Sequence, residues 1–210
     1  MRRFIIGKVL LAGALMLTGV TAWGQQPSSP AVSKKPVSID LAVTYAPERA
    51  QTAPGNCCFW FQGGGLDAVA SYSNGWGIAA AITGEHASNV GAGADVNKVS
   101  FLAGPRYTGT IHLAQTGRGK GRTLQIFGEG LLGAAHAFNT TIVSNPNIFQ
   151  TSDNVFALQL GGGFNLTGTG HFGIRLLQVD YVRTALPNNS SNSQDDLHLG
   201  IGATYHFGLR

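Results

Sequence analysis

Strict alternation of apolar with small or polar residues near the end of the chain constrains the fold more than any other feature. Leu197, Leu199, Ile201, Ala203, Tyr205 and Phe207 alternate with His198, Gly200, Gly202, Thr204 and His206. In a β-strand these two sets point to opposite faces, so the segment predicts a strand with one apolar face. Residues 37–45 follow the same two-residue period. Residues 37–45 and residues 197–207 are therefore both expected to be strands.

Composition excludes the main alternatives to a β-fold. Glycine makes up 30 of the 210 residues, and only 11% of the residues are charged. An average soluble domain has about 7% glycine and about 25% charged residues. Because an interior glycine costs a helix about 1 kcal/mol relative to alanine, a helical bundle is not expected. With 43% hydrophobic residues the chain can bury a core, so one all-β domain is predicted.

Turn signals divide residues 37–207 into eight candidate strands. Their approximate bounds are 37–45, 61–72, 76–84, 97–110, 122–137, 154–166, 172–184 and 197–207. Short turns at 73–75 and 168–170 alternate with longer polar connections at 47–56, 85–96, 139–153 and 186–195. Residues 109–121 are too long for a tight turn unless both arms extend the hairpin. Antiparallel strands in up-and-down order are expected.

Charge distinguishes a membrane barrel from a secreted soluble barrel or sandwich. A soluble β-domain carries Lys and Glu on its solvent side, whereas the polar sides of these strands hold mostly Gly, Ala, Ser, Thr and Gln. Outer-membrane barrels have even strand numbers, short periplasmic turns and an apolar exterior. Aromatic residues also collect near the short turns, as expected for an interfacial girdle. They are Tyr72, Trp76, Tyr107, Phe172, Tyr205 and Phe207. The pattern favours an all-β, eight-stranded antiparallel up-and-down transmembrane β-barrel.

Four further segments occur in a definite order along the chain. They are Gly104-Pro105-Arg106-Tyr107-Thr108, Gly161-Gly162-Gly163-Phe164, Asp180-Tyr181-Val182-Arg183-Thr184, and the closing strand with Tyr205 and Phe207. Their order and spacing resemble the small OmpA-like and opacity-porin-like outer-membrane β-barrels over about residues 37–207. The resemblance implies an integral barrel with both termini in the periplasm and no particular reaction. Such chains usually end on the aromatic residue, whereas Gly208-Leu209-Arg210 follow here.

Residues 1–24 have the features of a secretory signal peptide. Three basic residues precede an apolar run at 9–17, and small residues follow it, so we expect cleavage after Gly24. Residues 25–36 are expected to form a solvated periplasmic leader, and residues 37–207 the barrel. Cleavage removes three of the positive charges behind the net charge of +4, so no nucleic-acid partner is expected. The expected location is the cell outer membrane after export.

Strand parity predicts a polar network inside the barrel. Arg106 and Glu129 lie opposite the apolar faces of their strands, so both should point inward. Pairing them centres the hairpin between Gly117 and Arg118, in the most turn-like part of the connection. An Arg106–Glu129 ion pair is therefore predicted to plug the lumen, joined by Gln159 and Asp180. The facing of the seventh strand stays open, because Arg175 and Asp180 cannot both point inward without a bulge.

The expected function is a structural or surface-interaction role without catalysis, cofactor or metal. Expected partners are outer-membrane lipids, lipopolysaccharide and the barrel-assembly machinery, which would act on the C-terminal strand of a monomer. A narrow pore is one alternative. A lipid A deacylase-like hydrolase is another, because His86-Ala87-Ser88-Asn89 resembles the motif of those barrels. Glu85 and Asp95 are the nearby acids, and both are expected in an outer loop.

Cys57 and Cys58 are the only cysteines in the chain. Their Cα atoms are about 3.8 Å apart, which is closer than the usual range for a disulfide, so a vicinal bridge would be strained. A strained staple in the first outer loop, two free thiols and a bridge to another chain all remain open.

Overall fold

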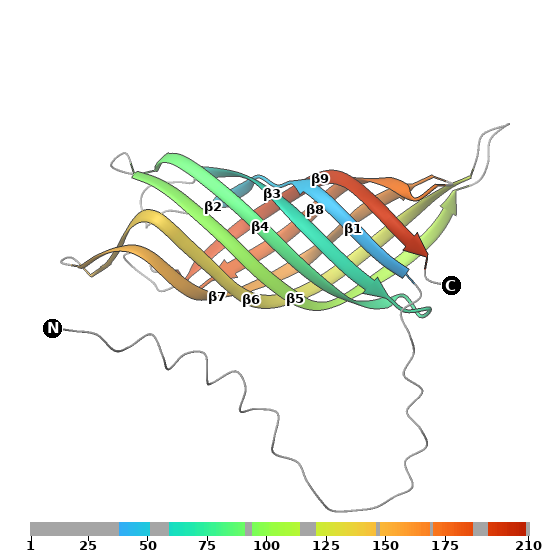
Figure 1. The fold of residues 1–210 in the computed structure, drawn as a ribbon, viewed down its shortest axis with the longest axis horizontal. Helices are drawn as coiled ribbons and strands as arrows, with labels where there is room; N and C mark the ends of the chain where they lie inside the picture. Colours follow the sequence, from blue (N-terminus) through green and yellow to red (C-terminus); the bar gives the residue numbers. More distant parts are fainter. Residues whose placement is uncertain are drawn as a thin grey trace, which may run out of the picture. The chain divides into compact units, whose positions relative to one another are not determined.

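The computed structural model describes residues 38–50, 59–90, 94–113, 121–145, 148–168, 170–186 and 193–208. They form one antiparallel sheet that closes into a barrel (Figure 1). The strands are β1 (Ser38–Tyr45), β2 (Glu48–Ala50), β3 (Phe59–Ser71), β4 (Trp76–Val90), β5 (Ala94–Leu113), β6 (Arg122–Asn145), β7 (Ile148–Thr167), β8 (Phe172–Thr184) and β9 (Gln194–Gly208). From β3 to β9 each strand pairs with the next along the chain, and β1 pairs with both β3 and β9, which closes the barrel.

β1 and β2 are two parts of one strand, interrupted at Pro47. Both pair with β3 and with β9. They keep a single register, since Tyr45 lies opposite Gly64 and Glu48 lies opposite Phe61. Proline has no N–H to donate to a sheet, which explains the break. The barrel therefore has eight strands, and the predicted fold class is confirmed.

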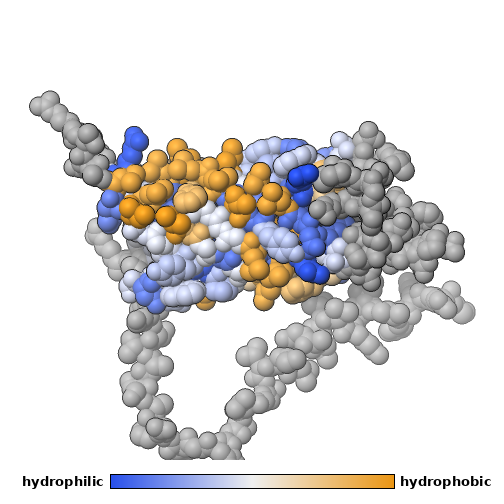
Figure 2. All heavy atoms as spheres, turned by 180° about the vertical axis from the view of Figure 1, so that it is seen from behind, coloured by the Kyte–Doolittle hydropathy of each residue, from blue (hydrophilic) through white to orange (hydrophobic). Residues whose placement is uncertain are grey.

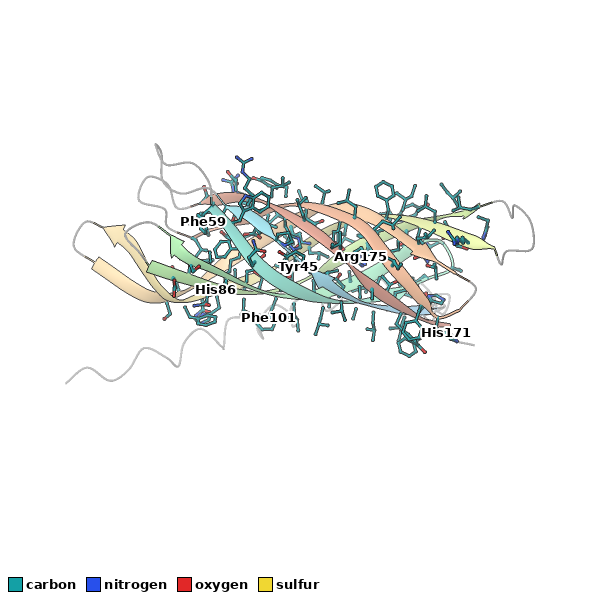
Figure 3. All side chains as sticks on the ribbon, turned by 90° about the horizontal axis from the view of Figure 1, so that it is seen from above. Tyr45, Phe59, His86, Phe101, His171 and Arg175 are labelled. Carbon is teal, nitrogen blue, oxygen red and sulfur yellow. The ribbon has the colours of Figure 1, made fainter. Side chains whose placement is uncertain are left out.

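The outward side chains of the described strands are mainly apolar, whereas most of the charged side chains on these strands are buried in the interior. Exposed outward side chains include Leu41, Val43, Ile78, Ile82, Phe101, Leu132, Phe156 and Ile201. On β9, Ile201 is 53% exposed, whereas His198 is 5% exposed. Apolar side chains gather on the outer surface in Figure 2, and Figure 3 shows Phe101 projecting away from the wall. A soluble barrel would have the reverse arrangement, so the soluble alternative is wrong.

Two hairpins at the outer end are longer than the sequence predicts. Residues 85–96 and 139–153 were expected to be polar loops, and this expectation is wrong. β4 continues to Val90 before β5 begins at Ala94, and β6 continues to Asn145 before β7 begins at Ile148. Polar residues can still form paired strands, because the hydrogen bonds between strands are made by backbone groups that nearly every residue has. The polar composition of these segments was therefore a poor guide to their structure.

The opposite end of the barrel carries the short turns. The turn between β3 and β4 has Gly75 at φ 84°, a conformation that favours glycine, and the Tyr72 N–H donates to the Trp76 carbonyl at 2.7 Å. The β5–β6 hairpin extends as predicted, with Leu113 opposite Arg122. β1 begins and β9 ends at the same end, which we take as periplasmic because outer-membrane barrels have their short turns there.

A bulge in β8 settles the facing of that strand. The pairing of β8 with β9 shifts between Arg175 and Gln178, and Leu176 and Leu177 both face outward. One extra residue on the outer side returns Gln178 and Asp180 to the interior. Arg175 and Asp180 are therefore both buried, which regular alternation would not allow.

Aromatic rings form a girdle at the periplasmic end, which confirms the prediction for five of the six residues, whereas Tyr72 lines the periplasmic mouth of the lumen. The rings of Trp76 and Tyr107 are 5.3 Å apart, and Tyr205 contacts Phe172 at 4.8 Å and Phe207 at 4.4 Å between ring centroids. We call these five residues the inner girdle.

No helix among the described residues is long and apolar enough to cross a membrane. The expected signal peptide, the leader, Cys57 and Cys58 lie outside the described residues.

Candidate functional site in the barrel lumen

Arg106 on β5 and Glu129 on β6 form an ion pair inside the barrel. They are opposite each other in the ladder, which is the predicted register, and Ile111 lies opposite Leu124 in the same register. Arg106 Nε donates to Glu129 Oε2 at 2.7 Å, and Nη2 of the same guanidinium contacts that oxygen. Both side chains are buried. The guanidinium thus holds the carboxylate with two charge-assisted hydrogen bonds.

Gln159 and Asp180 lie in the same network, joined by Gln178. Gln159 Nε2 donates to Asp180 Oδ2 at 2.9 Å and lies 3.4 Å from Glu129 Oε1. Gln178 Nε2 donates to Glu129 Oε1 at 3.1 Å and to Asp180 Oδ2 at 2.7 Å. The structure therefore brings the four sequence-predicted residues together. His198 Nδ1 extends the network, 3.0 Å from Asp180 Oδ2.

A missing side chain at Gly161 makes room for this network. Gly161 lies between Glu129 and Asp180 in the ladder. A Cβ added to it would be 2.1 Å from Asp180 Oδ1 and 2.3 Å from the Val179 carbonyl oxygen. Glycine is therefore needed at this position so that the Asp180 carboxylate can pack across the lumen.

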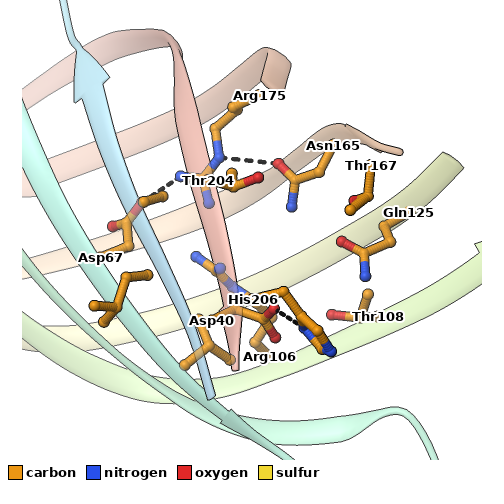
Figure 4. Close-up of a pocket in the computed structure, with 13 residues that line it drawn as sticks. Asp40, Asp67, Arg106, Thr108, Gln125, Asn165, Thr167, Arg175, Thr204 and His206 are labelled. Carbon is orange, nitrogen blue, oxygen red and sulfur yellow. Dashed lines mark hydrogen bonds and ion pairs between the residues drawn. The ribbon is translucent and has the colours of Figure 1, made fainter. Parts of the chain in front are cut away.

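Arg175 provides a second buried cation on the periplasmic side of the network. Its guanidinium pairs with Asp67 and donates from Nε to Asn165 Oδ1 at 3.1 Å (Figure 4). It also donates to Gln178 Oε1 at 2.5 Å. The Phe127 ring lies between two guanidinium groups, with its centroid 4.4 Å from Arg106 Cζ and 4.9 Å from Arg175 Cζ. Both guanidinium groups are thus within reach of a cation–π attraction to this ring.

Lys98 is the centre of a second ionic cluster, toward the outer end. Its ammonium pairs with Glu48, lies 2.9 Å from Glu85 Oε2 and 4.0 Å from Asp196 Oδ2. All four side chains are buried. The expectation that Glu85 lies in an outer loop is therefore wrong. β4 continues through Glu85. Because side chains alternate between the two faces of this strand, the Glu85 carboxylate points inward.

The spaces found beside these groups in the described part of the lumen are small. The space beside Glu48, Glu85 and His198 is about 10 Å³, and the space beside Asp67, Arg106 and Arg175 is about 20 Å³. Each has the volume of about one or two water molecules. A wider polar mouth of about 380 Å³ opens at the periplasmic end. At its edge His206 Nδ1 lies 2.5 Å from Asp40 Oδ1, and Figure 4 shows this contact.

Sequence reasoning missed Lys98, Glu48, Glu85, Asp67 and Gln178 as lumen residues. Parity could have found Lys98, because it lies eight residues from Arg106 on the same strand and shares its face. Glu48 and Glu85 were missed because both lie in segments read as loops. Gln178 faces the lumen only because of the β8 bulge, and no residue type in the sequence predicts that bulge.

His86 and Ser88 lie on β4 with exposed side chains, on the outer face of the barrel. His86 Nδ1 lies 2.9 Å from Asn97 Oδ1, its ladder partner on β5. Glu85 is on the opposite face and contacts Lys98, so it cannot orient the His86 imidazole.

Comparison with known proteins identifies the architecture. No protein-family model and no curated protein matches the chain. Matching solved structures include Ail, the attachment invasion locus protein of Yersinia pestis, with 17% identity, coverage of 82% of this chain and 99% of that chain, and a TM-score of 0.49. Neisserial surface protein A matches with 14% identity, 80% and 97% coverage and a TM-score of 0.50.

At such low sequence identity these similarities show the fold alone. That fold agrees with the closed barrel and the apolar exterior described above. The chain has the fold of the small eight-stranded outer-membrane β-barrels, the architecture of the OmpA-like and opacity-porin-like proteins.

Proposed function

We propose that this protein is a structural or surface-interaction component of the outer membrane, without catalytic activity and with a closed lumen. The observation that carries the proposal is the lumen network. Three buried cations (Lys98, Arg106 and Arg175) each pair with buried carboxylates, and spaces of about 10 and 20 Å³ remain beside them. Barrels of eight strands are usually filled in this way. A filled barrel leaves its outer hairpins as the parts that reach a partner.

Conductance across a planar bilayer tests the closed lumen. We expect the purified, folded protein to give no steady single-channel current, because the two ionic clusters occupy the lumen and the spaces beside them are each only about 10 to 20 Å³. A matched variant that removes the plug without adding charge, Arg106→Ala with Glu129→Ala, should show more current than the native chain. Stable channels in the native protein would favour the narrow pore instead.

The outer hairpins formed by β4–β5 and β6–β7 support an interaction role. Both stay paired nearly to their tips, with Val90 opposite Ala94 and Asn145 opposite Ile148. Ordered edges of this kind can present a surface to a ligand at low entropic cost. Replacing residues 139–151 by a short Gly-Ser turn should abolish adhesion of expressing cells to a ligand-coated surface while the barrel still assembles. Equal adhesion of cells expressing the native chain and the variant would restrict the role to envelope structure. The detergent resistance of the same cells measures that structural role.

Export by a signal peptide at residues 1–24 and assembly through the last strand form part of this proposal. β9 pairs with β1 to close the barrel, and Tyr205 and Phe207 are in the inner girdle near its end. These positions suit recognition by the barrel-assembly machinery. Lipopolysaccharide and other outer-membrane lipids would surround the apolar wall of a monomer.

A lipid A deacylase-like hydrolase is the second candidate. Asn97 holds His86 Nδ1 on the outer face, and Ser88 is exposed two residues further along the same face. This supports an oriented imidazole beside a hydroxyl, as in nucleophilic hydrolases. Mass spectrometry of lipid A from cells expressing the native chain or Ser88→Ala tests it. Loss of an acyl chain with the native protein alone would establish the hydrolase and overturn the non-catalytic proposal.

A further inference from the structure

Laterally bonded polar side chains surround the barrel near its outer end. We call this ring the outer collar. Its members are Tyr45 with Gln62, His86 with Asn97, His136 with Asn154, and Tyr181 and Arg183 with Asp195. Each group bridges two adjacent strands: β1 and β3, β4 and β5, β6 and β7, and β8 and β9. All eight strands of the barrel therefore contribute to the collar.

The collar lies one lipid-band height from the inner girdle. Trp76 and His86 are ten residues apart on β4, as are Tyr107 and Asn97 on β5. At about 3.3 Å per residue and a tilt of about 40°, ten residues rise about 25 Å, which is the height of the apolar band of such barrels. The outward residues between Trp76 and His86 are Ile78, Ala80, Ile82 and Gly84. The collar is thus at the headgroup level of the outer leaflet.

The two ends of the lipid band have different chemistry. The inner girdle consists of aromatic rings, whereas the outer collar combines two tyrosine hydroxyl groups with two imidazoles, three amides, an exposed guanidinium and one carboxylate. The carboxylate, Asp195, is shared by Tyr181 and Arg183. The collar therefore has a surplus of groups that donate hydrogen bonds or carry positive charge. Such a set suits phosphate and sugar hydroxyl groups.

The two His–Asn pairs are the best-placed part of the collar. Nδ1 of His86 and Nδ1 of His136 contact the amide oxygens of Asn97 (2.9 Å) and Asn154 (2.7 Å). Since an amide oxygen only accepts, Nδ1 is the donor in both contacts, which fixes each ring with Nε2 pointing away from the asparagine. Nε2 can then accept from a sugar hydroxyl in the neutral ring or donate to phosphate in the protonated ring, beside the amide NH₂ of the asparagine. Val99 lies opposite His136, and Asn97 lies opposite Phe138, so the pairs occupy neighbouring hairpins.

We propose that the outer collar binds the phosphorylated sugar headgroup of the outer-leaflet glycolipid, with the His86–Asn97 and His136–Asn154 pairs as the main contacts. The inference rests on the proposed function only in requiring an assembled outer-membrane barrel. The repetition of the pair on two hairpins favours a binding row over a single reaction centre, because His136 has Phe138 where His86 has Ser88.

Native mass spectrometry of the full protein in detergent micelles tests this inference. The probes are diphosphorylated lipid A, dephosphorylated lipid A and phosphatidylglycerol. We expect the native protein to retain diphosphorylated lipid A best, because phosphate and sugar are both recognised. His86→Ala with His136→Ala should weaken that retention roughly tenfold, which corresponds to about one lost charge-assisted hydrogen bond.

His171→Ala is the matched control. His171 is also an exposed, hydrogen-bonded histidine, but it lies at the periplasmic end, with Nδ1 2.8 Å from the His206 carbonyl oxygen (Figure 3). It should retain lipid A like the native chain, and gel mobility without boiling verifies that every variant folds. Equal retention by the double variant, or equal binding of dephosphorylated lipid A or phosphatidylglycerol by the native chain, would overturn the inference. The closed lumen is tested separately by conductance, so either proposal can fail alone.

Discussion

At the scale of single residues, the lumen holds more negative than positive side chains, so each cation has a large structural effect. Glu129→Ala leaves Arg106 buried without its carboxylate, and removing one partner of a buried pair typically costs about 3–5 kcal/mol. Urea unfolding in detergent micelles should show a clearly lower midpoint. Asp95→Ala is the control, because Asp95 is an exposed carboxylate on the same strand as Arg106. Glu85 is unsuitable as an exposed control, since it is buried against Lys98.

Lys98 should show a pH-dependent effect when it is removed. Lys98→Met leaves Glu48, Glu85 and Asp196 close together without their shared cation. Near neutral pH the free energy of unfolding should fall by roughly 3–5 kcal/mol. Lowering the pH to about 5 should reduce this difference from the native chain, because protonation removes buried negative charge from the variant. A difference that grows as pH falls would contradict the assigned cluster.

At the scale of one element, the β8 bulge decides which side chains of that strand face lipid. Leu176 and Leu177 both face outward, and this keeps Arg175 and Asp180 in the lumen. Deleting Leu177 should force one of the two charged residues outward and break the network. We expect loss of the folded, faster-migrating band on unboiled gels. Leu177→Ala keeps the residue count and should retain that band, whereas normal folding of the deletion would show that the bulge is dispensable.

At the scale of the whole molecule, the apolar exterior positions the barrel in its membrane. Ile201 lies near the middle of the lipid band, so Ile201→Arg should lower folding stability in liposomes by roughly 2–4 kcal/mol. Leu113 is also exposed and apolar, but it lies six residues beyond Tyr107 of the inner girdle, on the β5–β6 hairpin. Leu113→Arg should therefore cost much less. Urea titration of both variants in the same liposomes compares their free energies of unfolding. Equal losses of stability would contradict the placement of Leu113 outside the lipid band.

The sequence by itself determined the strand number, the inside and outside of most strands, and the Arg106–Glu129 register. These features follow from alternation and turn chemistry, which act over a few neighbouring residues. Parity on two consecutive strands was enough to place Arg106 opposite Glu129, because an antiparallel hairpin has one register once its turn is located.

Only the tertiary structure decided the length of the outer hairpins, the bulge in β8 and the clusters around Lys98 and Arg175. Glu85 is polar like a loop residue, but it lies in a strand, where its backbone pairs with that of Lys98 on β5. Its carboxylate contacts the ammonium of the same lysine, which also pairs with Glu48 from β2. Asp67 and Arg175 are far apart in the chain and meet only when the barrel closes. Closure brings together strands that no local pattern relates, so the composition of the lumen is a property of the whole sheet.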